Sequence, residues 1–562
     1  MKTQLNYKFG RYSDDFETTT DPEDCRVWAF ASCPLSDLEK IEIGNNIEDY
    51  IDYCYKTGGT HYFHNLKFDA DFIINWMLNN GFSHVKDRKQ LTEKTFTTLI
   101  SEQNQFYSMK ICFDKSKRHT CEFLDSLKII PMKVEQMPKA FNISDKKLEI
   151  DYTEKREKGH ELTEDEIAYI KNDVVIVAKA LCYILGQGLT KMTQGSNALA
   201  DYKQIIGEKQ FKYLYPPPTY DADIRQSYKG GFTYLNPLYK NKEVGKGIVL
   251  DVNSLYPSVM YYEALPYGEG KYFKGKYKQD NLYNLYIQKL VCQFDLKENH
   301  IPTIQIKSSR WFNETEYLTS SGEHEVTLCL TNIDLKLFFE HYDVYNITYI
   351  DGYKFKSAHN LFKDYIDKWY SLKKQASEEG NEPLRTLCKL MLNSLYGKFA
   401  TSPRVCGKIP NLTEEGATKY SAGEIEEKEP IYIPMGSFIT SYARNKTIRS
   451  AQKVYDRFVY SDTDSLHLLG DDLPKELEID PYKLGAWKHE STFSRAKFIR
   501  QKCYMEEIKG ELKITCAGLP EECKKYVTWE NFKPGAYYPG KLMPLHVPGG
   551  TVLVEKGYTM KG

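Results

Sequence analysis

The chain is 562 residues long, which exceeds what one hydrophobic core can serve and indicates several domains. Its 41% hydrophobic and 27% charged residues exclude a disordered or fibrous chain, and its net charge of -1 neither favours nor excludes a nucleic-acid partner. The 13 cysteines lack metal-ligand spacing, which favours reduced thiols without structural zinc, and no apolar run approaches the roughly 18 residues of a membrane span.

An acidic strand is predicted near the N-terminus. In the segment Asp14–Thr20, strand alternation places Asp15 and Glu17 on one face. The segment Tyr62–Asp69 then predicts a strand that runs into a helix, with Asp69 at the junction.

A helix with a capping-box-like start, Thr163 to Glu166, follows later in the N-terminal third. Tyr169 and Asp173 are four residues apart and therefore share one face of this helix. Any one acid is an ordinary surface carboxylate, but several on separate elements indicate a two-metal phosphodiesterase site, with Tyr169 orienting the attacking water. The four acids are Asp15, Glu17, Asp69 and Asp173.

The middle of the chain begins after a stiff linker, Pro216–Pro218. The paired glycines Gly230 and Gly231, next to Tyr228, let backbone approach a phosphate, although such a pair alone is usually a turn. Asp251 ends a buried-strand pattern and suits a metal ligand, or else it caps a helix. Tyr256 would close over the ribose of a nucleotide and exclude a 2′-hydroxyl.

Two helices are predicted at Leu361–Ser377 and from Leu384 to about Phe399, forming an antiparallel hairpin. On the second helix, Lys389, Asn393 and Tyr396 are spaced so that they share one face. This face either binds a nucleotide or is simply a solvent-exposed polar face. Lys373 and Lys374 of the first helix could add phosphate contacts.

A hairpin is predicted at Tyr460–Ser465, between two apolar runs. Its two carboxylates, Asp462 and Asp464, can point to the same side, where a pair of Mg²⁺ ions would relieve their repulsion. A solvated turn is the alternative, because Asp, Ser and Thr are ordinary turn residues.

In this order, the motifs resemble those of proofreading family B DNA polymerases, and most closely the protein-primed branch found in tailed bacteriophages. The resemblance implies an α/β multidomain fold, in which a ribonuclease-H-like 3′–5′ exonuclease domain precedes a right-hand polymerase domain with inserted terminal-protein regions. The exonuclease domain would span 1–192 and the polymerase domain 193–562. Within the latter we expect palm at about 193–261 and 427–512, insertions at 262–360 and 401–426, fingers at 361–400 and thumb at 513–562. The segment between Tyr504 and Cys516 is shorter than in this family, which leaves the size of the thumb open.

The resemblance also implies residue roles. Catalytic residues would be Asp15, Glu17, Asp69, Tyr169 and Asp173 in the exonuclease and Asp251, Asp462 and Asp464 in the polymerase. Metal ligands would be these acids together with Val252. Nucleotide-binding residues would be Ser254, Leu255, Tyr256, Lys373, Lys374, Lys389, Asn393 and Tyr396. Contacts to single-stranded DNA would come from Thr18, His64, Asn65, Phe68, Ser126 and Leu127, with support from Lys147 and Tyr152. Contacts to primer-template would come from Tyr228, Gly230, Gly231, Thr440, Arg444, Lys502 and Tyr504.

The implied function is DNA-directed synthesis of a linear viral DNA genome, primed by a terminal protein, with proofreading and strand displacement. Two Mg²⁺ ions per active site are implied, with Mn²⁺ as a substitute. The partners would be primer-template DNA, dNTPs, terminal protein and single-stranded DNA, with no membrane, for a virus-encoded monomer in the host cytoplasm. Two alternatives stay open: a family B polymerase primed by RNA or DNA, and a replication scaffold with inactive sites.

Overall fold

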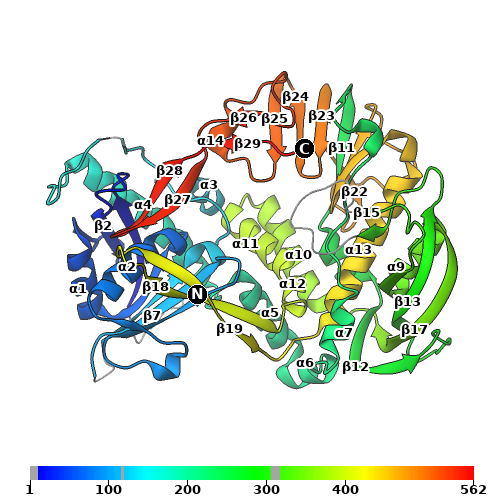
Figure 1. Ribbon diagram of the computed structural model, residues 1–562, viewed down its shortest axis with the longest axis horizontal. Coiled ribbons are helices and arrows are strands. Elements are labelled where there is room, and N and C mark those ends of the chain that lie inside the picture. Colours follow the sequence, from blue (N-terminus) through cyan, green and yellow to red (C-terminus); the bar gives the residue numbers. More distant parts are fainter. Residues whose placement is uncertain (1–9, 116–118, 153, 306–316) are drawn as a thin grey trace.

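The computed structural model describes residues 10–115, 119–152, 154–305 and 317–562. Its N-terminal part lies at one end of the molecule and a β-rich part at the other, with a helical group between them (Figure 1). Within the described ranges, no helix is long and apolar enough to cross a membrane.

The N-terminal part is built on an eight-stranded mixed sheet in the order β3-β2-β1-β4-β8-β7-β6-β5. Helix α4 (Glu164–Gly186) packs on β1 and β2, while α2 (Leu66–Asn79) packs on β7 and β8. Thr163 caps α4 and forms the predicted capping box with Glu166. The strands are β1 (Arg11–Thr18), β2 (Val27–Pro34), β3 (Glu42–Gly44), β4 (Gly59–Phe63), β5 (Ser83–His84), β6 (Thr95–Ile100), β7 (Phe106–Cys112) and β8 (Thr120–Asp125), and the other helices are α1 (Ile47–Thr57) and α3 (Met137–Phe141).

A five-stranded antiparallel sheet, in the order β22-β11-β21-β20-β9, lies at the centre of the C-terminal part. One face is covered by α8 (Leu255–Tyr262) and α13 (Ile433–Lys453), which pack against each other. Alternate residues of the strands, such as Ile248, Leu250 and Leu466, point into this core and are fully buried. The strands are β9 (Thr233–Leu235), β11 (Gly247–Val252), β20 (Phe458–Asp462), β21 (Ser465–Leu469) and β22 (Trp487–Phe493).

A second sheet, β10-β23-β24-β25, continues from this core. Its strands are β10 (Glu243–Val244), β23 (Arg495–Arg500), β24 (Cys503–Ile508) and β25 (Glu511–Cys516). Strands β24 and β25 are joined only by Lys509 and Gly510, so the short segment between Tyr504 and Cys516 is a tight hairpin.

The residues expected as the first insertion, 262–360, contain a separate sheet in the order β12-β17-β13-β16 with α9 (Asn332–His341) packed on it. The strands are β12 (Leu265–Lys274), β13 (Leu285–Leu296), β16 (Val326–Thr331) and β17 (Tyr342–Ala358), and a small pair is formed by β14 (Ile304–Gln305) and β15 (Tyr317–Leu318).

The predicted helical hairpin is present as α10 (Lys363–Glu378) and α11 (Glu382–Ser394). The prediction that the second helix continues to Phe399 is wrong. The helix ends at Ser394, and a short helix α12 (Tyr396–Phe399) follows Leu395. The Lys398 N–H bonds to the Leu395 carbonyl, a tighter step than the four-residue step of an α-helix. The neighbouring helices are α5 (Gln194–Ile206), α6 (Glu208–Leu214) and α7 (Asp221–Arg225).

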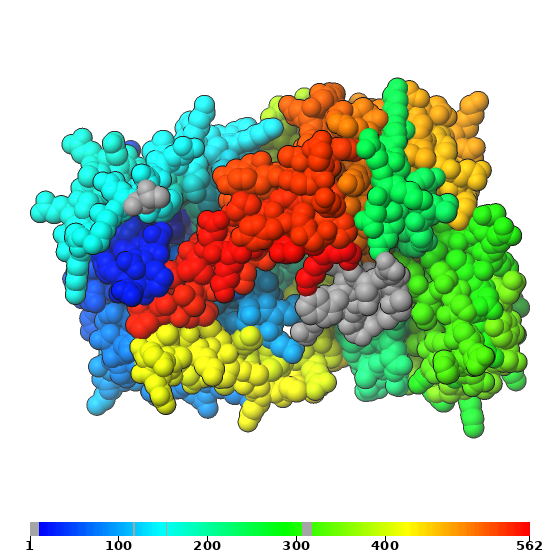
Figure 2. Space-filling view, turned by 45° about the horizontal axis from the view of Figure 1, so that its top comes forward, coloured from blue at the N-terminus to red at the C-terminus, as the bar shows by residue number. Residues whose placement is uncertain are grey.

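Two hairpins of the C-terminal half of the chain pack against the N-terminal part. One is formed by β18 (Arg404–Leu412) and β19 (Thr418–Glu427), and the other by β27 (Leu542–Val547) and β28 (Gly550–Glu555). Both contact α2, and the red C-terminal segment runs along the yellow hairpin to the blue N-terminal part (Figure 2). The remaining C-terminal elements are α14 (Glu521–Lys524), β26 (Tyr537–Tyr538) and β29 (Tyr558–Thr559).

Candidate active sites

Four acids of the N-terminal part form one cluster. Asp15 and Glu17 lie on β1, Asp69 is in the first turn of α2, and Asp173 is on α4. Burial and the charge of Asp173 raise the pKa of Asp15 to about 7. Burial together with Asp15 also raises the pKa values of Glu17 and Asp69. Asp15, Glu17 and Asp69 therefore each feel the negative charge of another acid of the cluster, as expected for carboxylates that share a site.

The cluster fits a hard divalent cation. Asp173 keeps one carboxylate oxygen, Oδ1, buried and without a hydrogen-bond partner among the described residues. Its other oxygen lies 3.3 Å from the Lys147 ammonium, as part of an ion pair. A set of carboxylates with an unused buried oxygen and raised pKa values suits Mg²⁺, which prefers such ligands.

Two tyrosines stand beside this cluster. The hydroxyl groups of Tyr152 and Tyr169 are 2.9 Å apart. Burial and the charge of Glu17 raise the pKa values of both, so both stay protonated at neutral pH. A protonated tyrosine hydroxyl at this position can orient a water molecule near the acids.

The residues expected to hold single-stranded DNA divide into two groups. Thr18, Asn65, Phe68 and Leu127 are at least partly exposed beside the cluster. His64 and Ser126 face inwards. The Ser126 hydroxyl, fully buried, donates to the Phe63 carbonyl and lies 3.0 Å from His64 Nδ1. Burial lowers the pKa of His64 to about 4, so its ring is neutral. The Ser126 hydroxyl can therefore position His64, and the expected contact of Ser126 with single-stranded DNA stays a prediction.

The second acidic centre lies at the end of the five-stranded sheet. The predicted hairpin is present, and Asp462 and Asp464 flank the Thr463 turn between β20 and β21. Asp251 is the last residue but one of the neighbouring strand β11, and the Val252 N–H donates to the Asp464 carbonyl. Burial and the charge of Asp251 raise the pKa of Asp464 to about 6. Here too, clustered carboxylates suit a hard divalent cation.

The two acids of the hairpin differ in their surroundings. Asp462 Oδ1 accepts hydrogen bonds from the hydroxyl groups of Thr233 and Thr463. The Lys502 ammonium lies 3.1 Å from Asp462 Oδ2. Asp462 is therefore already satisfied by the protein, whereas Asp464 faces the charge of Asp251.

Lys488 is a member of this centre that sequence reasoning missed. Its ammonium lies 3.0 Å from Asp251 Oδ2, because β22 places Lys488 directly opposite Asp251 on β11. It also lies 3.6 Å from Glu490. Nothing in the sequence near Lys488 marks it as a site residue, because only the register between the strands brings it to Asp251.

The predicted nucleotide-facing residues lie around the same centre. The rings of Tyr256 and Tyr396 stack, with centroids 4.0 Å apart. Lys389 and Asn393 are exposed on one face of α11. Burial and the nearby charges of Lys389 and Lys488 lower the pKa of Lys373. The other predicted members are Lys374, exposed on α10; Ser254, at a positive φ of 54° before α8; Leu255, buried at its start; and Val252 on β11.

The paired glycines pack against the hairpin turn. A Cβ on Gly231 would lie 2.6 Å from Thr463 Oγ1, so only glycine fits there without displacing the turn. A Cβ on Gly230 would meet nothing, because this residue faces open space. The ring of Tyr228 lies near Tyr396, whose charge contributes, after burial, to raising the pKa of Tyr228.

Thr440 and Arg444 were expected to contact primer-template, but both are buried, with 1% and 3% exposure. Arg444 Nη1 donates to the carbonyl oxygens of Lys229 and Gly230 at 2.8 Å, and its Nη2 bonds to Asp334. The Thr440 hydroxyl donates to carbonyls of its own helix. Arg444 thus supports the backbone of the glycine segment, and the expected contact of Thr440 and Arg444 with primer-template stays a prediction. Lys502 and Tyr504 flank the same centre, with Tyr504 packed on Tyr460 at 5.0 Å.

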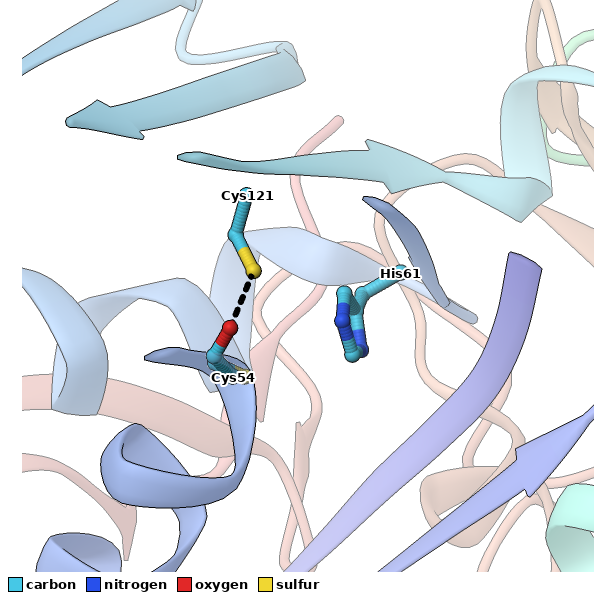
Figure 3. Close-up of side chains that lie close together, drawn as sticks. All are labelled: Cys54, His61 and Cys121. Atoms are coloured by element: carbon cyan, nitrogen blue, oxygen red, sulfur yellow. Dashed lines mark hydrogen bonds between the residues drawn. The ribbon is translucent and has the colours of Figure 1, made fainter. Parts of the chain in front are cut away.

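A third group of possible ligands, Cys54, His61 and Cys121, lies buried in the N-terminal part (Figure 3). Its hydrogen bonds are satisfied without an ion, since Cys121 donates to the Cys54 carbonyl. His61 Nδ1 contacts Asp14 and its Nε2 contacts the Gly58 carbonyl. Burial alone lowers the pKa of His61, but Asp14 raises it to about 9, so the ring is a cation that donates from both nitrogens. This group is a buried ion pair rather than a metal centre.

The relatives of the chain extend over nearly its whole length. The family model described as "DNA polymerase type B, organellar and viral" matches residues 53–157 and 146–479. The DNA polymerase of Bacillus phage phi29 is 48% identical over 98% of this chain and 99% of that protein. The DNA polymerase of Streptococcus phage Cp-1 is 33% identical over 98% of each chain.

Solved structures agree. Phi29 DNA polymerase complexed with primer-template DNA matches with a TM-score of 0.93 at 46% identity, over 98% of this chain and 100% of that one. Its ternary complex with primer-template DNA and incoming nucleotide substrates also matches with a TM-score of 0.93. The expected fold class, a mixed α/β multidomain polymerase with an exonuclease part and a palm, fingers and thumb layout, is confirmed. Identity and structural similarity of this extent show that the chain belongs to the type B DNA polymerases of organelles and viruses.

Proposed function

We propose that this DNA polymerase replicates a linear viral double-stranded DNA, primed by a hydroxyl group of a terminal protein, and that it proofreads with the N-terminal site. The observation that carries the proposal is the presence of two separate carboxylate clusters in one chain. One comprises Asp15, Glu17, Asp69 and Asp173, and the other Asp251, Asp462 and Asp464. Two such sites suit two opposite reactions on a DNA 3′ end, extension and hydrolysis.

At the polymerase site, Asp251 and Asp464 would hold two Mg²⁺ ions, with Asp462 close by. When bound, the ions lower the pKa of the attacking 3′-hydroxyl and stabilise the pyrophosphate that leaves. Lys389 and Lys373 would neutralise the triphosphate. Burial and then the repulsion from Lys389 lower the pKa of Lys373, and a bound triphosphate would relieve that repulsion. The stacked rings of Tyr256 and Tyr396 would form a wall against the sugar and base of the incoming dNTP.

At the exonuclease site, the chain's own residues would orient water. The Tyr169 hydroxyl, paired with Tyr152 at 2.9 Å, would hold the attacking water in line. Lys147 would stabilise the cluster through Asp173 and approach the scissile phosphate. Thr18, Asn65, Phe68 and Leu127 would bind the unpaired 3′ end by stacking and amide contacts, while Ser126 positions His64.

Further parts follow from the same proposal. Residues 262–360 would dock the terminal protein, and 401–426 would enclose downstream template and assist strand displacement. The solved phi29 complexes with primer-template DNA, nucleotides and single-stranded DNA support the proposed DNA and dNTP partners. The phage origin of the relatives supports action in the cytoplasm of a bacterial host, as a monomer apart from terminal protein.

Paired variants test the assignment of the two sites. Asp251→Ala and Asp464→Ala should each abolish primer extension and leave 3′-end trimming intact. Asp15→Ala with Glu17→Ala should do the reverse. If either polymerase variant incorporates dNTPs at the wild-type rate, the polymerase site is wrongly assigned.

Protein priming needs a separate experiment. The purified polymerase, its cognate terminal protein, Mg²⁺ and labelled dATP should yield a nucleotide covalently linked to the terminal protein. A polymerase that extends DNA primers but labels no candidate terminal protein would support priming by RNA or DNA instead.

A further inference from the structure

Two cysteines face each other across a β-hairpin next to the polymerase site. Cys503 on β24 and Cys516 on β25 are paired in register, and their sulfur atoms are 3.3 Å apart. Both are buried, with 0% and 8% exposure. All 13 cysteines are free thiols, and this is a direct sulfur–sulfur hydrogen bond.

The backbone at this pair suits a disulfide. The neighbouring Ala517 N–H donates to the Lys502 carbonyl at 2.7 Å, so Lys502 and Ala517 form a hydrogen-bonded pair of the ladder. Pairs alternate along an antiparallel ladder, so Cys503 and Cys516 are a non-hydrogen-bonded pair, the type with the closest side chains. Their Cα atoms are then about 4.5 Å apart, within the range of about 4.4–6.8 Å that disulfides span.

Cys516 has the surroundings of a reactive thiol. The hydrogen bond from Cys503 lowers the pKa of Cys516 against the opposing effect of burial, and Tyr558, Arg500 and Lys524 also lower it. The Tyr558 hydroxyl lies 3.5 Å from the Cys516 sulfur. The thiolate is the form of cysteine that peroxides oxidise, and 8% of the surface of Cys516 is exposed, against 0% for Cys503.

The pair borders on a residue of the polymerase site. Lys502 directly precedes Cys503 and adopts a left-handed conformation with a φ of 54°. Its N–H bonds to the Tyr460 hydroxyl at 3.0 Å, and its ammonium pairs with Asp462. A change in the separation of β24 and β25 therefore acts directly on the backbone that aims Lys502 at Asp462.

We propose that Cys503 and Cys516 are a modification site, a thiol pair that a peroxide converts reversibly to a disulfide, with a change in how Lys502 meets Asp462. The Cys516 thiolate attacks hydrogen peroxide and, with one proton, yields a sulfenic acid and water. The Cys503 thiol then attacks the sulfenic sulfur, an S–S bond forms, and a second water leaves. The two sulfur atoms together lose two electrons, which reduce the peroxide.

Mass spectrometry of the full-length protein tests the site without reference to any activity. The protein is treated with hydrogen peroxide, remaining thiols are alkylated, and trypsin releases residues 503–509 and 514–524 as separate peptides. We expect these peptides to be linked after oxidation and separate again after dithiothreitol. The second peptide also contains Cys523, so fragment ions must place the link at Cys516, and Cys523→Ser must keep it while Cys516→Ser removes it.

The half-buried Cys182 and Cys406 serve as internal references for exposure. The proposed site is wrong if both of these are oxidised while Cys503 and Cys516 remain alkylatable, or if the link forms at Cys523.

Primer extension tests the effect on Lys502, and this step rests on the proposed polymerase function. We expect oxidation to slow extension by wild-type protein at least fivefold and dithiothreitol to restore it, whereas Cys503→Ser should extend at one rate before and after oxidation. A linked protein that extends at the unoxidised rate would show that the disulfide does not act on Lys502. An absence of extension before oxidation would contradict the proposed function instead and leave the mass-spectrometric result standing.

Discussion

Lys488 and Asp251 form an ion pair of 3.0 Å across neighbouring strands of the polymerase site. The pair places a protein cation against a carboxylate that would bind a metal ion. The Lys488 side chain is 34% exposed, so it can swing away when a divalent ion arrives. On this basis we expect Lys488 to compete with a metal ion for Asp251 and to neutralise the carboxylate until the ion binds.

Replacing Lys488 should change the Mg²⁺ concentration that primer extension requires. In Lys488→Met the competing cation is gone, and we expect the Mg²⁺ concentration for half-maximal extension to fall about fivefold, roughly 1 kcal/mol for a partly exposed charge. Lys488→Arg keeps the charge and should behave like wild type. Mn²⁺ binding followed by electron paramagnetic resonance gives the same comparison without catalysis. If the metal concentration at half-saturation is the same in Lys488→Met as in wild type, Lys488 does not compete with the metal ion.

The exonuclease acids should make the metal-free protein less stable as pH rises. The folded pKa of Asp15, about 7, lies above its ordinary value of 3.8, so the folded state binds more protons than the unfolded state between these values. Stability is therefore lost as pH rises through this window. Asp15→Asn removes the effect and should be about 1–3 kcal/mol more stable than wild type at pH 8 in EDTA, but by less than about half of that difference at pH 5, where much of the loss has yet to occur. Thermal unfolding at both pH values measures the difference in stability between Asp15→Asn and wild type.

The control for this experiment is Asp471→Asn, which removes an exposed acid paired with Lys246. It should leave the difference between pH 5 and pH 8 as in wild type. Added Mg²⁺ should close the gap between Asp15→Asn and wild type at pH 8. A gap of the same size at both pH values would contradict the assignment of the raised pKa to Asp15.

Site residues and helix ends could be predicted from the sequence where the adjacent residues form a recognisable pattern. Asp462 and Asp464 sit on a hairpin whose apolar flanks are visible in the sequence, and the Thr163 capping box predicts where α4 begins. The sequence could not reveal Lys488, because its partner is set by the register between β22 and β11. Nor could it show that Thr440 and Arg444 are buried, since a helix with a polar face looks the same whether that face meets DNA or Asp334.

Tyr256 should decide between ribose and deoxyribose. Its ring is fixed by stacking on Tyr396 at 4.0 Å, so it cannot move aside for a 2′-hydroxyl. Tyr256→Val should raise incorporation of ribonucleotides relative to dNTPs at least tenfold in kcat/KM. Tyr396→Phe keeps the stacked ring and should keep the discrimination within about threefold. Equal discrimination in Tyr256→Val and wild type would remove Tyr256 from this role.

Arg444 should matter for stability and for template binding through different contacts. Arg444→Met leaves the Asp334 carboxylate without its ion pair, and we expect a loss of about 3–5 kcal/mol in unfolding free energy. The double variant Arg444→Met with Asp334→Leu removes both charges and should recover most of this stability. It should still bind primer-template more weakly, because the carbonyls of Lys229 and Gly230 have lost their hydrogen bonds from Arg444.

Chemical denaturation measures the change in stability, and fluorescence anisotropy measures the change in template binding. Template affinity restored together with stability would contradict the positioning role.

Asp71 joins three parts of the molecule that are far apart in the sequence. This fully buried carboxylate on α2 accepts a hydrogen bond from the Tyr420 hydroxyl on β19 at 2.8 Å. Its other oxygen accepts from Thr551 on β28 at 2.5 Å and lies 3.0 Å from His546 Nδ1 on β27. In Figure 2 the red C-terminal segment lies next to the yellow hairpin, beside the blue N-terminal part. Because this side chain bonds to both hairpins, its loss should loosen the attachment of both to the N-terminal part.

We therefore expect Asp71→Ala to shorten the DNA products made in a single binding event at least tenfold, while the rate of adding the first nucleotide changes less than twofold. The first addition should be nearly unaffected because the polymerase centre lies on other elements. Products should be shorter because hairpins that no longer enclose the template let the DNA dissociate sooner. Extension in the presence of excess heparin measures the product length, and limited proteolysis within 404–427 measures release of the hairpin. Tyr420→Phe removes one of the hydrogen bonds and should give an intermediate product length. Products of wild-type length from Asp71→Ala, with the hairpin more easily cleaved, would show that the enclosure opens without affecting the grip on DNA.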